Sequence, residues 1–344
     1  MSEIRYDQLY DTHVIIAPER LHRPDYTPAG PDGEETAPAT CPFCEGNEAM
    51  TPPEIFALRG AGSFPNEAGW QTRVVPNLYK ALQIEAPHRA HFHELHHHWE
   101  GFGAHEVIID TPRHCTSMLQ WNKAEAAAWL MTLRSRVADL RRDIRIAYIS
   151  LFKNEGRLAG STQPHAHTQL IGLPIIPHAE RERYRRSFEH FTMSGRSLFE
   201  SLLLQEEAEQ TRIVARNGEF TAYCPYASGY PFEVMISSVA NMGQVDTLTD
   251  TTIASLAALL VDVLKRMERQ LGRFDFNLQV VTPPLKEQAL PEGMLCSTEH
   301  ACRFAIRIMP RIYRHGGFEA VTGILINPVA PETAAKLLRE GRDG

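Results

Sequence analysis

Two histidines one residue apart, followed by a glutamine, make the stretch "HAHTQLIGLPII" (165–176) the part of this sequence best suited to chemistry. Its apolar run predicts a buried strand, in which side chains two residues apart point to the same side. We therefore expect His165, His167 and Gln169 to share one face. A neutral imidazole is a capable nucleophile near pH 7. A backbone hydrogen bond to one ring nitrogen of His167 would leave the other nitrogen free to attack.

The residues just before the histidines indicate what His167 would attack. Glycines let backbone N–H groups approach phosphate oxygens closely, and hydroxyl and amide groups add neutral donors. Gln169 can donate to a phosphoryl oxygen but cannot take up a proton, which favours a long-lived nucleotidyl-histidine and transfer over hydrolysis. The alternative is a strand with polar residues on a wet face. The stretch "NEGRLAGSTQ" (154–163) holds the candidate phosphate-binding residues Asn154, Gly160, Ser161 and Thr162.

A second group of residues has the spacing of a metal site. Cys41 and Cys44 in "CPFC" place two thiolates on a tight turn, from which both can reach one tetrahedral ion. The sequence has no second Cys-x-x-Cys pair, so two of its 16 histidines must complete the set. We select His114 and His165 over the histidine-rich segment 88–98, which reads as a polar, mobile loop. Thiolate and imidazole ligands in four-coordination favour zinc; the alternative is two ordinary cysteines in a turn.

The elements around these residues occur twice along the chain, each time as strand, long helix, strand, loop and strand. This repetition predicts an internal duplication. We expect an α+β fold of two tandem halves, each a mostly antiparallel sheet with a long helix packed on it. Residues 1–190 form the catalytic, metal-bearing half and 191–344 a degenerate second repeat with the acceptor segment. The predicted elements are strands 105–110, 146–154 and 165–176 with helix 123–143, then strands 232–237, 276–282 and 303–310 with helix 250–271.

The two copies differ at the reactive residues. Sliding one copy onto the other brings "HAHTQ" opposite "RFAIR". The second copy then has Arg303 and Ala305 where the first has His165 and His167. The copies share a scaffold, and we expect only the first to carry the chemistry.

Composition excludes several classes of protein. Of the 344 residues, 43% are hydrophobic and 22% are charged, which is typical of a soluble globular protein. No apolar run is long enough to span a membrane, and the start "MSEIRYDQLYDTHVIIAPER" lacks the features of a signal peptide, so we expect a cytoplasmic protein. The net charge of −7 argues against a nucleic-acid partner. Six cysteines in a chain this long do not make a disulfide framework.

In combination, these motifs resemble those of one family. "NEGRLAGSTQPHAHTQ" is similar to the signature of galactose-1-phosphate uridylyltransferases and their relatives, the transferase branch of the histidine-triad superfamily. The hydrolases of that superfamily have a third histidine at the position of Gln169. The resemblance extends over nearly the whole chain and implies two histidine-triad-like halves. The other matching segments are "VIIAPERLHRP" (14–24), "CPFC" (41–44), "RVVPNLY" (73–79), "HEVIIDTPRH" (105–114) and "GGFEAVTGILINPVAPETAAKLLRE" (316–340).

The resemblance implies a ping-pong nucleotidyl transfer in galactose metabolism, between UDP-glucose and a hexose 1-phosphate. His167 would be the nucleophile and Gln169 would hold the phosphoryl group. The four cysteine and histidine residues proposed above match the family's zinc ligands. The residues implied at the phosphates of the bound nucleotide are Asn154, Ser161 and Thr162.

Other implied contacts involve a second subunit, because relatives complete each active site across a homodimer interface. Arg20 and Arg23 match a pair that reaches the phosphates of the nucleotide sugar, often across that interface. Asn77 would face the nucleoside. The residues implied at the sugar phosphate are Glu319, Gly323 and Asn327.

One departure from the family concerns the second half. Many relatives have His-x-His where this chain has "CRFAIRI" (302–308), which argues against a second metal. The family also contains ADP-glucose phosphorylases and adenylylsulfate:phosphate adenylyltransferases, which use adenine donors and inorganic phosphate. Three hypotheses follow: a uridylyltransferase, an adenylyltransferase of this kind, and a zinc-stabilised nucleotide-binding protein without turnover. The intact His167 and Gln169 argue against the third.

Overall fold

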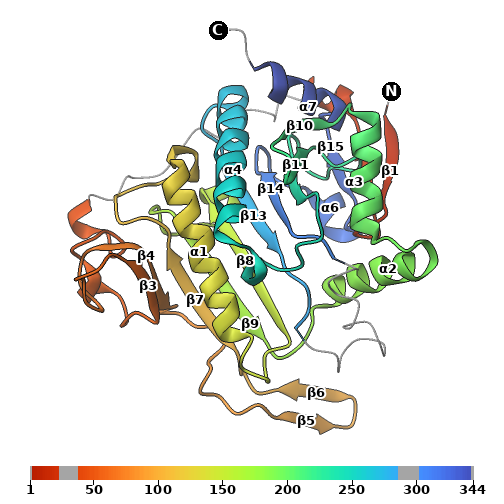
Figure 1. Cartoon of the computed structure of the whole chain (residues 1–344). Helices are drawn as coiled ribbons and strands as arrows, with labels where there is room; N and C mark the ends of the chain where they lie inside the picture. Colours follow the sequence, from red (N-terminus) through yellow and green to blue (C-terminus); the bar gives the residue numbers. More distant parts are fainter. Residues whose placement is uncertain (1, 23–37, 286–301, 342–344) are drawn as a thin grey trace.

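The structure is a computed structural model in which residues 2–22, 38–285 and 302–341 are described. Arg23, expected at the phosphates of the nucleotide sugar, lies outside these residues. Two long helices, α1 (Lys123–Leu140) and α4 (Asp250–Leu271), run across one face of a large sheet (Figure 1). Within the described part of the chain, no helix has the length and apolar character needed to cross a membrane.

One ten-stranded antiparallel sheet forms the centre of the molecule. The first half of the chain contributes β3 (Phe56–Arg59), β4 (Trp70–Pro76), β7 (Ala104–Ile109), β8 (Tyr148–Glu155) and β9 (His167–Leu173). The second half contributes β10 (Ile213–Arg216), β11 (Phe220–Tyr223), β12 (Val234–Ser238), β13 (Phe276–Val281) and β14 (Ala305–Pro310). Their order is β10-β11-β12-β14-β13-β8-β9-β7-β4-β3, so β8 and β13 pair at the seam between the halves.

The strand order confirms the two tandem halves, because the topology is the same when counted from either edge of the sheet. β7, α1, β8 and β9 correspond to β12, α4, β13 and β14. The pairing registers agree as well, since His167 pairs with Ile109 as Ala305 pairs with Ser237. The structure therefore supports the alignment of "HAHTQ" with "RFAIR". The boundary at residue 190 stays a prediction.

Helices α1 and α4 pack on each other and on the same face of the sheet. Each begins at a capping residue, since the Asn122 side chain accepts backbone N–H groups of α1 and Thr249 does the same for α4. Their apolar side chains, Leu133 and Leu260 among them, are buried in one core with the facing side chains of both half-sheets. Because this core fills the space under the helices, we expect a ligand site on the opposite face, here called the rear face.

In the second half, other elements cover the rear face. They are α2 (His178–Ser194), α3 (Leu198–Glu209) and the turn after β1 (Glu3–Asp7). A separate core joins these elements to the sheet. Its members include Leu9, Tyr184, Leu203, Met235 and Ala305.

The two ends of the described chain meet in a three-stranded sheet beside the second half (Figure 1). β1 pairs with β2 (Thr12–Ile16), and β2 pairs in parallel with β15 (Leu325–Asn327). The short helix α6 (Gly317–Thr322) precedes β15, and α7 (Pro331–Glu340) follows it.

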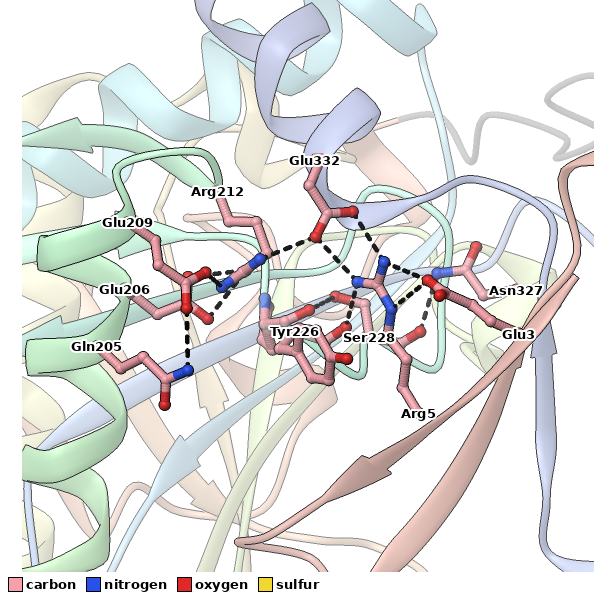
Figure 2. Close-up of polar contacts among 11 residues, drawn as sticks. Glu3, Arg5, Gln205, Glu206, Glu209, Arg212, Tyr226, Ser228, Asn327 and Glu332 are labelled. Atoms are coloured by element: carbon pink, nitrogen blue, oxygen red, sulfur yellow. Dashed lines mark hydrogen bonds and ion pairs between the residues drawn. The ribbon is translucent and has the colours of Figure 1, made fainter. Parts of the chain in front are cut away.

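Ion pairs attach this small sheet to the second half. Figure 2 shows Arg5 and Arg212 converging on Glu332 at the start of α7, with Nη1 atoms 3.0 and 2.8 Å from the same carboxylate oxygen. Arg212 also pairs with Glu206 of α3, Nε to Oε2 at 2.8 Å. Burial raises the pKa of Glu206 to about 7, although Arg212 acts in the opposite direction. Paired in this way, two arginines can be buried next to the second half-sheet.

The histidine-rich segment is a hairpin, so the prediction of a loop at 88–98 is wrong. β5 (Ala90–His93) pairs with β6 (His96–Trp99), and all residues of both strands are exposed. His91 stacks on His98 with ring centroids 4.6 Å apart. Cross-strand ring pairs of this kind stabilise a short ribbon, and the polar composition concealed them.

Candidate active site and metal centre

The four predicted metal ligands lie together, although they come from separate segments. One ligand atom from each of Cys41, Cys44, His114 and His165 lies within 4.8 Å of the other three. The Cys44 Sγ is 3.1 Å from the His114 Nδ1 and 3.6 Å from the His165 Nδ1. The Cys41 Sγ is 3.5 Å from the same His165 atom. These separations match those between ligand atoms around one tetrahedral ion.

The protonation chemistry of these residues also suits a cation. The His165 Nε2 lies 3.0 Å from the Thr111 carbonyl oxygen and donates to it, so the Nδ1 faces the cysteines without a proton. Burial lowers the pKa of His165 to about 4, which keeps the ring neutral. Burial and the neighbouring Cys41 raise the pKa of Cys44 to about 12. Cysteine thiols lose their protons when they bind a metal cation. The four residues therefore fit a metal ion.

Short-range hydrogen bonds shape the cysteine turn. The Cys44 N–H donates to the Cys41 carbonyl at 3.2 Å, and Asn47 Nδ2 donates to the same oxygen at 2.8 Å. The Glu45 N–H donates to the Pro112 carbonyl at 3.1 Å, which ties the turn to the segment that carries His114. Hydrogen bonds to backbone carbonyls therefore give the turn its shape and its anchor.

β9 begins at His167, so the prediction that His165 also lies in this strand is wrong. The Ala166 N–H donates to the Cys115 carbonyl at 2.7 Å, and the Ala166 carbonyl accepts from the Asp110 N–H at 3.3 Å. These bonds hold the residues ahead of the strand against the segment after β7. His165 can therefore face the cysteine turn while the strand starts with His167.

His167 has the orientation expected of a nucleophile. Its neighbour Thr168 accepts from the Trp129 Nε1 of α1 at 2.9 Å, so Thr168 faces the helices and His167 points to the rear face. The His167 Nδ1 lies 2.8 Å from the His165 carbonyl oxygen and donates to it. The neutral ring therefore has an unprotonated Nε2. The predicted backbone hydrogen bond is confirmed, and the Phe43 ring packs edge-on against the imidazole at 5.5 Å.

A buried cation lies beneath this strand. Lys153 is 1% exposed, and its Nζ donates to the Asp110 Oδ2 at 2.8 Å and to the His167 carbonyl oxygen at 3.1 Å. Burial lowers the pKa of His167, and the Lys153 ammonium lowers it further. Both effects keep the imidazole neutral. Lys153 and Asp110 were not predicted, because an alternating strand sequence does not show which charged residue is buried.

The glycine-bearing loop begins beside His167. Phe152 of β8 pairs with Gln169 of β9, and continuing this register places Asn154 opposite His167 on the rear face. The Asn277 Nδ2, from β13 of the second half, donates to the Asn154 Oδ1 at 2.9 Å. With its oxygen engaged, Asn154 turns its amide nitrogen toward the loop, as expected for a phosphate-contacting residue.

The loop itself needs glycine where it leaves β8. Gly156 has φ +83°, and a Cβ there would lie 1.9 Å from the Asp275 Oδ1. The Asp275 Oδ2 accepts the Leu158 N–H at 2.8 Å, which fixes the loop from the second half. Farther along the loop, Gly160 has φ +88°. The Ser161 hydroxyl donates to the Gln163 carbonyl at 2.9 Å, and Thr162 is exposed.

Gln169 lies two residues beyond His167 on the same face and contacts a histidine that was not predicted. Its Oε1 is 3.1 Å from the His105 Nε2. The Asn77 Nδ2, expected at the nucleoside, is also 3.1 Å from that nitrogen. His105 stands in "HEVIID", which was predicted only to be a strand. The structure therefore brings Asn77 and Gln169 to one imidazole.

Residues predicted at the sugar phosphate lie in another part of the molecule. Glu319 and Gly323 belong to α6 and its C-terminus, and Arg20 follows β2. The Ala17 N–H donates to the Asn327 carbonyl at 2.9 Å, which joins these segments. Figure 1 shows α6 and β15 beside β1, away from β7 and β9. Within the described chain, this second group is not assembled around His167.

Asn327 itself has a structural role. It is fully buried, and its Nδ2 donates to the carbonyls of Ser228 at 2.9 Å and Tyr230 at 3.2 Å. Its Oδ1 accepts the Val329 N–H at 2.9 Å. Both polar atoms of the side chain thus have partners inside the protein, and we leave Asn327 out of the acceptor site.

Comparison with known proteins agrees with this arrangement. Residues 1–177 match the family model described as "Galactose-1-phosphate uridyl transferase, N-terminal domain". The chain is 30% identical to the ADP-glucose phosphorylase of Arabidopsis thaliana, over 98% of this chain and 92% of that protein. It is 24% identical to the galactose-1-phosphate uridylyltransferase of Saccharomyces cerevisiae, over 83% of this chain and 79% of that one.

A solved structure shows the same fold. The crystal structure of an ADP-glucose phosphorylase from Arabidopsis thaliana with bound ADP-glucose gives a TM-score of 0.80 at 28% identity, and the match covers 99% of each chain. The family model covers more than half of the sequence, and the Arabidopsis relative matches nearly all of it. The chain therefore belongs to the galactose-1-phosphate uridylyltransferase family of nucleotidyltransferases.

Proposed function

We propose that this chain transfers a nucleotidyl group from a nucleotide sugar to a phosphate-bearing acceptor by way of a covalent nucleotidyl-His167. The observation that carries the proposal is the hydrogen bond from the His167 Nδ1 to the His165 carbonyl, which leaves an unprotonated Nε2 on the rear face. Asn154 and Gln169 flank His167 on the same face. The loop that starts at Gly156 adds backbone N–H groups, which suit phosphate oxygens.

Two displacements complete the reaction. In the first, the His167 Nε2 bonds to the α-phosphorus of the donor while the bond from that phosphorus to the bridging oxygen breaks, which releases the sugar phosphate. In the second, a phosphate oxygen of the acceptor attacks the same phosphorus and frees the imidazole. The proton stays on the Nδ1, hydrogen-bonded to the His165 carbonyl oxygen, and this bond stabilises positive charge on the ring. Asn154 and Gln169 donate to the phosphoryl oxygens, and no side chain has to move a proton.

Zinc is the ion that we propose for the four-residue group. Two thiolates and two imidazoles in four-coordination suit zinc better than a hard cation. A closed set of four protein ligands is typical of a structural site. Bound there, zinc would crosslink the cysteine turn to His165 and so hold the adjacent His167 in place. Metal content of the purified chain, measured by mass spectrometry, tests the identity of the ion.

Two donor–acceptor pairs are candidates, and each has its own support. UDP-glucose with a hexose 1-phosphate follows from the family model, which is that of the uridylyltransferases. ADP-glucose with inorganic phosphate follows from the Arabidopsis phosphorylase, at 30% identity against 24% for the yeast uridylyltransferase. The higher identity, over nearly the whole chain, leads us to place ADP-glucose first.

We also propose that a second copy of the chain completes the acceptor site. Arg20, Glu319 and Gly323 lie apart from His167 in the described chain, and α6 exposes Phe318 and Val321, at 44% and 87%. Mixing an inactive His167→Gly variant with an inactive Arg20→Ala variant tests this arrangement. If the sites are shared, mixed dimers recover activity; if each chain is self-sufficient, the mixture stays inactive.

A donor panel tests the function directly. UDP-glucose, ADP-glucose and adenylylsulfate are each supplied with inorganic phosphate or with a hexose 1-phosphate, and products are identified by mass spectrometry. We expect turnover of one nucleotide sugar with one acceptor class, and loss of that turnover in His167→Gly. A shift in thermal stability with nucleotides, but no product and no covalent adduct from any donor, would instead identify a nucleotide-binding protein.

A further inference from the structure

We infer that His105 is a positioning residue that orients the Gln169 carboxamide toward the phosphoryl group; this inference rests on the function proposed above. His105 and Gln169 lie on neighbouring strands, because Gln169 pairs with Val107 and His105 pairs with Ile171. The two residues are therefore diagonal neighbours on the rear face, within reach of long side chains. The distance from the His105 Nε2 to the Gln169 Oε1 is 3.1 Å.

The backbone determines which ring nitrogen of His105 carries the proton. The Ala81 N–H donates to the His105 Nδ1 at 3.1 Å, so this nitrogen is the acceptor. In a neutral imidazole the other nitrogen then bears the hydrogen. The Gln169 Oε1 and the Asn77 Nδ2 each lie 3.1 Å from the His105 Nε2. Only the first of these is an acceptor, so the Nε2–H donates to Gln169.

This hydrogen bond selects one of the two orientations of the Gln169 amide. With Oε1 turned to His105, the amide NH₂ of Gln169 is directed away from that histidine and can donate to an oxygen of the phosphoryl group on His167. In the flipped orientation the carbonyl oxygen would face the phosphoryl oxygens and repel them. His105 thus acts through Gln169 and has no contact of its own with the reacting atoms.

The same histidine fixes the segment expected at the nucleoside. The Asn77 N–H donates to the His105 carbonyl at 2.9 Å, and the Asn77 Oδ1 accepts the Tyr79 N–H at 2.8 Å. Together with the Ala81 contact, these bonds hold segment 77–81 on His105. Residues that the family would use for the base and for the phosphoryl group are therefore supported by one imidazole.

A double-mutant cycle tests the inference. The full-length chain is prepared as wild type, His105→Phe, Gln169→Ala and the double variant, with His96→Phe in the exposed hairpin as the matched control. The donor found in the panel is added without acceptor. The rate of nucleotidyl-enzyme formation and the lifetime of the adduct are followed by intact-protein mass spectrometry, and thermal unfolding of each variant is recorded.

We expect His105→Phe to slow adduct formation about 10- to 100-fold, as loss of a supporting hydrogen bond does at comparable sites. The double variant should be no slower than Gln169→Ala, because each substitution removes the same contribution, the hydrogen bond from a correctly oriented Gln169 amide to the phosphoryl group. His96→Phe should keep the wild-type rate. Independent, multiplying losses in the double variant, or a wild-type rate in His105→Phe, would overturn the role of His105. No adduct in the wild type would overturn the proposed function instead.

A second pair of variants covers the case in which His105→Phe does not fold. The amide of His105→Gln reaches the place of the Nε2 and can still donate to Gln169, whereas the amide of His105→Asn reaches the place of the Nδ1. We expect His105→Gln to stay within several-fold of the wild-type rate and His105→Asn to be as slow as Gln169→Ala. Equal rates for the two variants would contradict a role that acts through the Nε2–H.

Discussion

The rear faces of the two half-sheets carry different residues at equivalent positions. Where the first half has His167 and Gln169, the second has Ala305 and Arg307. The equivalence follows from the register of the strands on both sides. Gln169 lies between Val107 and Phe152, and Arg307 lies between Met235 and Gln279.

What covers each face differs more than the sheet beneath it. In the second half, the Arg307 Nε is 2.6 Å from the Glu233 Oε1, and the guanidinium lies 4.5 Å from the centre of the Tyr10 ring. The N-terminal turn, α2 and α3 seal that face. In the first half, the cysteine turn reaches only the start of β9, and Gln169 remains partly exposed. One duplicated scaffold can therefore hold a reactive face or a structural one, depending on the segments laid over it.

The largest expected effect comes from removing the His167 imidazole, whose equivalent position in the second half is Ala305. We expect His167→Gly to lower kcat/KM by at least about 10⁴-fold, because the nucleophile is lost. Steady-state kinetics with the donor found in the panel measures this loss. His97→Gly in the exposed hairpin is the matched control and should keep its activity. Residual turnover above one thousandth of wild type in His167→Gly would place the nucleophile elsewhere.

The next largest effect concerns the metal group, which has no counterpart among the described residues of the second half. We expect Cys41→Ser to lose bound zinc and about 3 kcal/mol or more of stability, because metal binding is coupled to folding. Metal analysis and chemical denaturation measure the two losses. Hydrogen exchange should increase at 41–47 and 110–116 but not in β12–β14. Cys224→Ser, at a buried cysteine of the second half, should retain the metal. Full metal content in Cys41→Ser would contradict the ligand assignment.

Two substitutions, one on each rear face, test whether one face serves stability and the other the reaction. We expect Arg307→Met to cost about 3 kcal/mol, since it leaves the buried Glu233 without its ion-pair partner, while kcat per folded chain stays near wild type. Gln169→Ala should do the opposite, with stability within about 0.5 kcal/mol of wild type and a slower reaction. Urea denaturation and single-turnover kinetics on the same preparations test both. A large loss of kcat in Arg307→Met would mean that the second face takes part in the chemistry.

The smallest expected effect is that of adding a histidine to the second half. Ala305 is fully buried, so Ala305→His should cost about 1–3 kcal/mol through overpacking. We expect no additional nucleotidyl label, because Ala305 lies in the buried core that α2 and α3 form with the sheet. Intact-protein mass after incubation with the donor checks this outcome. A second adduct on Ala305→His would show that a histidine at this position of the sheet is sufficient to accept a nucleotidyl group.

The sequence predicted best those features that depend on local pattern. Helix 250–271 matches α4 residue for residue, and the cysteine spacing with the choice of His114 and His165 led to all four members of the metal group. The backbone hydrogen bond of His167 also followed from chemistry alone. The helix and the cysteine pair need only short-range spacing, while the choice of histidines and the His167 hydrogen bond rest on the known preferences of the side chains.

Features that depend on distant pairing escaped prediction. Asp275 and Asn277 shape the glycine-bearing loop from the second half, and only the β8–β13 register brings them there. His105 on β7 contacts Gln169 on the neighbouring strand β9. The hairpin at 90–99 was hidden because its cross-strand ring pairs replace the usual apolar alternation. Asn327 is buried by the parallel pairing of β15 with β2, which joins the ends of the chain.

The most direct test of this account is to map the nucleotidyl group on the protein. The wild-type chain is mixed with ADP-glucose or UDP-glucose without acceptor, quenched, digested and analysed by mass spectrometry. We expect one nucleotidyl group per chain, on the peptide that contains His167, and none on peptides from β12–β14. Turnover without any covalent adduct, or an adduct on another residue, would contradict it.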